Sequence, residues 1–176
     1  PAELAANIAF GANLRAYRFD KYRTTEKADA KPSLKTFKVL SKATAAAKRS
    51  YSNLAKIADG VYLTRDLVSE PPNVIYPESL AKRAKELTKL GVKVQVLGEA
   101  QMKRLGMGAL LGVGQGSIRE SQMVVMEWNG LPKSANEKPV AFVGKGVTFD
   151  TGGISLKPGA GMEDMKWDMG GSGVVI

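Results

Sequence analysis

Apolar residues recur at helical spacing in three segments of the chain, which predicts three helices. The segments are residues 1–17, 42–69 and 77–90. Pro1 and Pro77 suit the first turn of the first and third helices, and Gly91 stands where the third should end. Pro71 and Pro72 should end the second helix, because proline lacks a backbone donor and clashes with the preceding turn.

Alternating or continuous apolar runs predict four strands, over residues 34–40, 92–97, 122–128 and 139–144. The last run is apolar throughout, as in a strand buried on both faces of a sheet. Between these runs we expect a short helix at 98–105, a glycine-rich turn region at 106–117, and polar loops at 22–35 and 129–138. Helix and strand alternate from residue 42 onward. The order predicts an α/β fold, with a mixed, largely parallel sheet flanked by helices and preceded by a linker helix.

The composition limits which catalytic groups and metal ligands this chain can supply. The 176 residues include no cysteine and no histidine, which excludes disulfides, thiolate ligands and imidazole bases within this chain. Any metal would be held by carboxylates, carbonyls, waters or a neutral amine. No apolar run is long enough for a spanning helix and no signal-like leader opens the sequence, so we expect a cytoplasmic protein that does not enter a membrane.

The formal net charge of +9 permits binding to nucleic acid or to an anionic membrane surface. The lysines and arginines are scattered through predicted helices, as at residues 82–85. Solvated helix faces explain that pattern more simply. Nucleic-acid binding therefore stays an alternative rather than the leading hypothesis.

The residues whose side chains could bind a metal or take part in catalysis follow the apolar run at 139–144. Lys145, Asp150, Lys157 and Asp168 lie in a stretch rich in glycine, whose small size would let the backbone approach a ligand closely. Ligands of open α/β sheets bind beyond the carboxyl ends of strands, so this stretch is well placed for a site.

Two carboxylates that converge repel each other unless a cation lies between them, and a divalent metal would serve. As a ligand, Lys145 would have to lose its proton, which coordination favours. Lys157 could keep its charge and stabilise an oxyanion. On residue types alone, two ordinary Asp–Lys ion pairs in a glycine-rich loop are the simpler interpretation.

The stretch VGKGVTFDTGGISLKP at 143–158, followed by MKWDMGG at 165–171, closely resembles the leucyl aminopeptidase family, also called cytosol aminopeptidases. Upstream, YRFDKY at 17–22 and RDLVSEPPN at 65–73 resemble the same family. The resemblance implies that Lys145, Asp150 and Asp168 are metal ligands, with Asp150 bridging two divalent ions. It also implies that Lys157 is a catalytic residue acting on the peptide carbonyl. Met165 would line the pocket for the first side chain of the substrate.

The activity implied is that of a two-metal aminopeptidase, which releases N-terminal amino acids, leucine-like ones preferred, from peptides with a free N-terminus. The metals would be manganese or zinc, with magnesium or cobalt as alternatives, and a metal-bridging water would attack the carbonyl. The resemblance further implies a cytoplasmic homo-hexamer. It divides the chain into an interdomain helix and linker at 1–40 and the N-terminal part of the catalytic domain at 41–176.

The family's second motif, NTDAEGR, does not occur in these residues. Pro1 and the apolar run at 173–176 indicate that both ends are cut from a longer protein. We therefore expect the 176 residues alone to bind metal weakly and to lack aminopeptidase activity. Two alternatives stay open: DNA binding, which some members of the family show, and a fold that serves only assembly.

Overall fold

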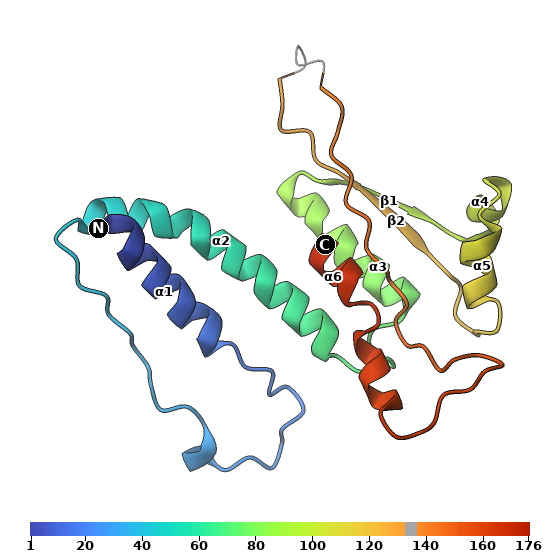
Figure 1. Ribbon diagram of the computed structural model, residues 1–176, viewed down its shortest axis with the longest axis horizontal. Coiled ribbons are helices and arrows are strands. Elements are labelled where there is room, and N and C mark those ends of the chain that lie inside the picture. The colour runs from blue at the N-terminus through green and yellow to red at the C-terminus, as the bar shows by residue number, and fades with distance from the viewer. Residues whose placement is uncertain (133–136) are drawn as a thin grey trace. The chain divides into compact units, whose positions relative to one another are not determined.

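The computed structural model describes residues 1–132 and 137–176, and the chain divides into two compact units, Pro1–Asp66 and Leu67–Ile176. The helices and strands, labelled in Figure 1, are α1 (Ala2–Ala16), η1 (Ala28–Ala30), α2 (Thr44–Ser69), α3 (Pro77–Lys85), η2 (Glu86–Leu90), β1 (Lys93–Leu97), α4 (Glu99–Arg104), α5 (Gly108–Gly114), β2 (Met123–Glu127), η3 (Met162–Trp167) and α6 (Gly170–Val175). The three long predicted helices are confirmed, the third with a 3-10 ending before Gly91. The domain boundary expected after residue 40 stays a prediction.

In the first unit, polar contacts join the end of α1 to the second half of α2. The Tyr17 hydroxyl donates to Asp66 Oδ1 at 2.8 Å, and Arg65 Nη1 donates to the Leu14 carbonyl at 2.6 Å. The rings of Tyr17 and Tyr62 meet edge to face, with centroids 5.1 Å apart. These contacts hold the two helices together at this end of the unit.

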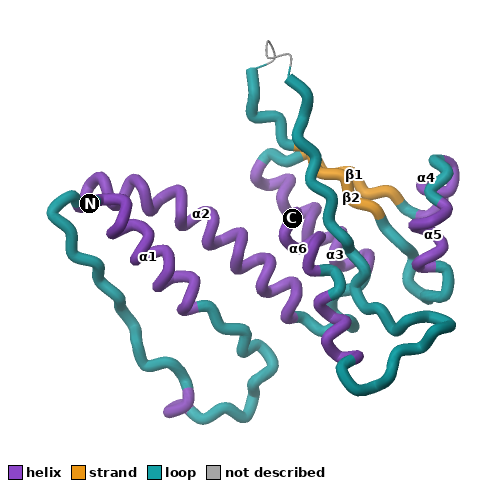
Figure 2. The backbone as a smooth tube through the Cα atoms, viewed as in Figure 1, coloured by secondary structure: helices purple, strands orange, loops and turns teal. Residues whose placement is uncertain are grey.

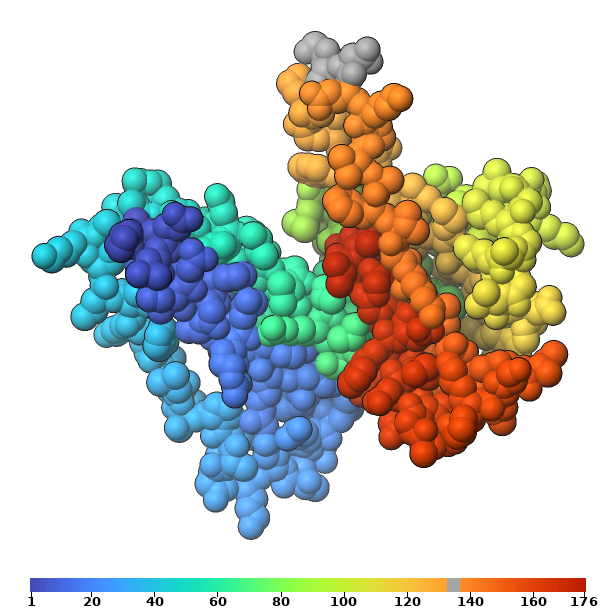
Figure 3. Space-filling model, in the orientation of Figure 1, coloured from blue at the N-terminus to red at the C-terminus, as the bar shows by residue number. Residues whose placement is uncertain are grey.

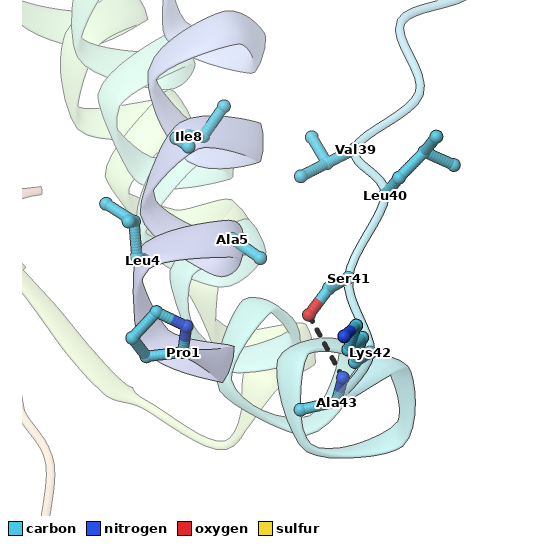
Figure 4. Close-up of a pocket in the computed structure, with 9 residues that line it drawn as sticks. All are labelled: Pro1, Leu4, Ala5, Ile8, Val39, Leu40, Ser41, Lys42 and Ala43. Carbon is cyan, nitrogen blue, oxygen red and sulfur yellow. Dashed lines mark hydrogen bonds between the residues drawn. The ribbon is translucent and has the colours of Figure 1, made fainter.

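A hollow of about 330 Å³ lies between the first half of α1 and residues 39–43 (Figure 4). Its walls are mostly apolar, with Leu4 and Ile8 on one side and Val39 on the other. Ser41 Oγ accepts a hydrogen bond from the Ala43 amide at 3.2 Å, just before α2 begins. The residues of the expected metal site do not line this hollow.

The strand expected at residues 34–40 is wrong, because the segment has no regular secondary structure. Leu34, Phe37 and Leu40 are 73%, 57% and 92% exposed. A strand satisfies its backbone groups by pairing with a neighbouring strand. Residues 1–66 contain no second strand with which it could pair.

In the second unit, α3 packs on a two-stranded sheet. The strands β1 and β2 are antiparallel, with Val94 opposite Met126 and Val96 opposite Val124. The buried core of the unit comes from α3, the ends of β1 and α4, and the start of α6. Its most buried members include Ile75, Leu80, Ala81, Ala84, Leu97, Met102 and Met169.

The mixed, largely parallel sheet is wrong for the described residues, whose only sheet is the antiparallel β1–β2 pair. Residues 139–144, expected as a buried strand, are loop (Figure 2). Val140, Phe142 and Val143 are 79%, 78% and 95% exposed, and the stretch that contains them is in view, in orange, in Figure 3. Its apolar side chains favour a strand, but no described strand pairs with its backbone.

The turn region expected at 106–117 is wrong in part, because Gly108–Gly114 forms α5. The glycines of this segment disfavour a helix by propensity, and packing of α5 against α4 overrides that preference. The loop expected at 129–138 includes residues 133–136, which lie outside the described residues. None of the helices in the described ranges is long and apolar enough to cross a membrane.

Candidate metal centre

Lys145 and Asp168 form an ion pair between two separate parts of the second unit, with Lys145 Nζ 2.6 Å from Asp168 Oδ1. Asp168 lies in the turn between η3 and α6. Its second oxygen, Oδ2, is buried and has no hydrogen-bond partner among the described residues. A buried carboxylate oxygen without a partner is costly. A cation bound beside it would remove that cost.

A close crossing of two backbone segments brings Lys145 to Asp168. The Ser172 amide donates to the Lys145 carbonyl at 2.9 Å. A Cβ atom at Gly144 would lie 2.6 Å from both the Gly171 carbonyl oxygen and Ser172 Cα, which is closer than atoms can approach. Figure 1 shows α6 beside the stretch that leads to Lys145. Glycine at position 144 is therefore required for this geometry.

A second Asp–Lys ion pair closes the loop from residue 150 to residue 157. Lys157 Nζ lies 2.8 Å from Asp150 Oδ2 and donates to the Asp150 carbonyl at 3.1 Å. The Lys157 amide donates to the Thr151 carbonyl at 2.9 Å, which fixes the loop's base. The Gly152 amide donates to Asp150 Oδ1 at 2.8 Å. Each oxygen of Asp150 thus has its own donor.

The pKa of Asp150 is lowered, mainly by the hydrogen bond from the Lys157 ammonium and next by that from the Gly152 amide. Partial burial opposes the shift, and the positive charges of Lys157 and Lys145 add to it. Lys145 therefore acts electrostatically on Asp150 while it is bonded to Asp168. The structure brings the four charged residues predicted from the sequence into one neighbourhood.

Met165, expected to line a substrate pocket, joins this neighbourhood through its sulfur. Met165 Sδ lies 3.2 Å from Lys157 Nζ. The two residues come from different segments, η3 and the loop before it. The thioether is a weak acceptor, so the contact steadies the ammonium without neutralising it.

Two carboxylates and one amine suit a divalent cation of the manganese, zinc or magnesium type. The orphaned Oδ2 of Asp168 also fits a missing cationic partner. Within residues 1–132 and 137–176, however, no three His, Cys, Asp or Glu side chains gather where a metal could bind. These residues could therefore supply only part of a ligand set, which waters or residues beyond the described ones would have to complete.

Both Asp–Lys ion pairs of the simpler interpretation are present. Two of the glycines have a structural role that was not expected, while the expected role of admitting a ligand stays a prediction. Gly144 makes room for the backbone of Gly171 and Ser172, and a Cβ at Gly152 would lie 2.2 Å from the Ser155 carbonyl oxygen. They serve the loop's own fold, which residue types alone did not reveal.

Sequence comparison matches residues 62–176 to the cytosol aminopeptidase family, catalytic domain. The chain is 61% identical over 175 residues to a probable cytosol aminopeptidase of Caulobacter vibrioides, covering 99% of this chain and 35% of that protein. A probable cytosol aminopeptidase of a Bradyrhizobium species is 55% identical, with 98% and 34% covered. The chain thus spans about a third of the length of the curated relatives it matches.

Solved structures agree with the sequence match. The bottromycin maturation enzyme BotP in complex with Mn superposes with a TM-score of 0.74 at 31% identity, over 98% of this chain and 34% of that one. The cytosol aminopeptidase from Coxiella burnetii gives a TM-score of 0.74 at 25% identity, over 97% and 34%. Because the family match covers well over half of the chain and includes the whole Lys145–Asp168 stretch, this protein belongs to the cytosol aminopeptidase family and carries part of its catalytic domain.

Proposed function

We propose that the complete protein carrying these residues is a two-metal aminopeptidase, which releases N-terminal amino acids, leucine-like ones preferred, from peptides. The observation that carries the proposal is the Lys145–Asp168 contact at 2.6 Å, beside a buried carboxylate oxygen that has no hydrogen-bond partner among the described residues. Relatives that are 53–61% identical are probable cytosol aminopeptidases, which supports the same activity here.

Lys145, Asp150 and Asp168 would hold the metals, with Asp150 shared between them. When bound, the metals would polarise the peptide carbonyl and supply a nucleophilic water near neutral pH. We propose manganese first, because the related BotP structure contains Mn. Zinc, magnesium and cobalt are the alternatives. Asp168 Oδ2 needs no rearrangement of hydrogen bonds to accept a cation, since it has none to lose among the described residues.

Lys157 would donate to the oxygen of the scissile carbonyl and stabilise the oxyanion that forms there. Its ammonium already lies beside Met165 Sδ, at 3.2 Å. That proximity supports a role for Met165 in contacting the substrate side chain next to the carbonyl. Met165, which would set the preference for the substrate side chain, and Lys157, which would stabilise the oxyanion, would then act on adjacent parts of one substrate.

The test is hydrolysis of leucine p-nitroanilide by the complete protein, first stripped of metal and then supplied with MnCl₂. We expect activity that depends on added Mn²⁺ and falls at least about a hundredfold in Lys157→Ala. Lys166→Ala, a lysine of the same region outside the proposed site, should retain the wild-type rate. Metal-independent hydrolysis, or equal rates in both variants, would reject the assignment.

The cytoplasmic homo-hexamer implied by the family resemblance stays a prediction, which sedimentation of the complete protein would check. DNA binding has only the family resemblance and the net charge of +9 in its favour. The described lysines and arginines include several paired on exposed helices, such as Lys82 with Glu78 at 2.8 Å. We therefore carry the peptidase hypothesis forward alone.

A further inference from the structure

Each carboxylate of the proposed metal set has a lysine as its counter-ion, but the two lysines differ in what metal binding would require of them. Lys145 belongs to the proposed ligand set, so on metal binding it would lose its proton and could stay beside Asp168 as a neutral amine. Lys157 does not belong to it. Its ammonium lies 2.8 Å from Asp150 Oδ2, an oxygen through which Asp150 could bind a metal.

Asp150 has no free oxygen in the described structure. Oδ1 accepts from the Gly152 amide at 2.8 Å, and Oδ2 is engaged by Lys157. The amide contact is neutral and belongs to the turn itself, so a cation can bind the same oxygen from another side. The Lys157 ammonium cannot share in this way, because a divalent cation at Oδ2 would meet a like charge within a few ångströms.

Lys157 is also held in place by more than the ion pair. Its ammonium donates to the Asp150 carbonyl at 3.1 Å and touches Met165 Sδ at 3.2 Å. Its side chain is 35% exposed, so a path to solvent is open. The Lys157 ammonium is thus paired with Asp150, and it can dissociate toward solvent.

We propose that Lys157 is a built-in counter-ion that competes with the divalent cation for Asp150, so that metal binding expels its ammonium from the carboxylate and releases it toward the substrate. The inference rests on the proposed metal site and describes how that site is loaded. It gives Lys157 two successive partners, the Asp150 carboxylate without metal and the substrate carbonyl with it. Lys157 is then available to the substrate carbonyl only when the metal site is occupied.

The test measures Mn²⁺ affinity of the metal-stripped complete protein, with MnCl₂ as the only ligand, by electron paramagnetic resonance of the free ion. We expect Lys157→Met to bind Mn²⁺ about three- to tenfold more tightly than the wild type, because the competing ammonium is gone. Lys157→Arg keeps the charge and should stay within about twofold of the wild type. Lys166→Met, which removes a charge that does not touch Asp150, should also stay within about twofold.

A second measurement uses the wild-type protein, so that it does not depend on the folding of a variant. Acetylation of Lys157 by acetic anhydride, followed by mass spectrometry, should rise several-fold when Mn²⁺ is added, while acetylation of Lys166 should not change. Unchanged labelling of Lys157, or Mn²⁺ affinity in Lys157→Met equal to or weaker than the wild type, overturns the inference.

The two proposals fail in different ways. Mn²⁺ binding and Mn²⁺-dependent peptidase activity in the wild type, with no gain in Lys157→Met, would remove the competition and leave the proposed function intact. Absence of Mn²⁺ binding in the wild type and in every variant would remove both.

Discussion

Asp168 Oδ1 and Lys145 Nζ lie 2.6 Å apart although 23 positions separate the two residues in the chain. The pair is asymmetric, because the Lys145 side chain is 58% exposed and that of Asp168 only 19%. Asp168, the less exposed partner, has one buried oxygen, Oδ2, without a hydrogen bond in the described structure. A residue arranged only for an ion pair would not need to bury a second, unsatisfied oxygen.

From this arrangement we predict that Asp168→Asn in the complete protein weakens Mn²⁺ binding by at least about tenfold. Loss of a metal ligand should lower the affinity at least as much as loss of a residue that supports a ligand. The substitution removes the negative charge and keeps the shape. Asp164→Asn is the matched control, because Asp164 is an exposed acid of the neighbouring η3. Isothermal titration with MnCl₂ measures both. Equal affinities in the two variants would contradict a ligand role for Asp168.

Gly144→Ala should destabilise the protein by about 1–3 kcal/mol, as overpacking of a close contact does. The added Cβ would lie 2.6 Å from two backbone atoms of the facing segment, so the crossing must open. Gly159→Ala is the control, since no atom lies within 4 Å of its added Cβ. Denaturant unfolding of both variants gives the comparison. If the two variants unfold at the same denaturant concentration, the backbone crossing at Gly144 is not as tight as described.

The pH dependence of Asp150 follows from its lowered pKa, which Lys157 and Gly152 produce by hydrogen bonding. Because the folded-state pKa is below the ordinary value of 3.8, the contribution of Asp150 to stability is present above that value. It is lost as the pH falls through the folded pKa. Carboxyl carbon NMR of the metal-free protein should therefore show Asp150 titrating below 3.8. In Lys157→Met the titration should move up toward the ordinary value, and no movement would mean that Lys157 does not cause the shift.

Much of the helical structure could be predicted from the sequence because a helix forms its backbone hydrogen bonds within its own segment. The apolar spacing of residues 42–69 and the prolines at 71 and 72 correctly gave α2 and its end. Strands depend on a partner, and two predictions failed for that reason. Residues 34–40 and 139–144 have strand-like side chains, but no described strand pairs with them.

The members of the candidate site could be predicted, but their pairing could not. Family resemblance pointed to Lys145, Asp150, Lys157 and Asp168. Spacing gave no reason to join Lys145 to Asp168 and Lys157 to Asp150, since either lysine could have reached either acid. The pairing depends on how closely Gly144 approaches α6, a tertiary contact that no local pattern records.

Gly152 and Gly153 are neighbouring glycines in the loop that returns Lys157 to Asp150. Gly152 has φ +93° and Gly153 has φ +65°, so alanine at either position costs about 1–2 kcal/mol in backbone strain. Only at Gly152 would the new Cβ also meet backbone, at 2.2 Å from the Ser155 carbonyl oxygen. Gly152→Ala should therefore be the more destabilised of the two in denaturant unfolding.

The same pair tests how the loop sets the charge at Asp150. Opening the turn in Gly152→Ala would take its amide away from Asp150 Oδ1 and move Lys157 off Oδ2, so the pKa of Asp150 should rise toward its ordinary value. In Gly153→Ala, where no atom lies within 4 Å of the added Cβ, the pKa should change less. If the pKa of Asp150 is the same in the two variants, the Lys157–Asp150 ion pair does not depend on this turn. Lys157 would then reach Asp150 through its own side-chain flexibility.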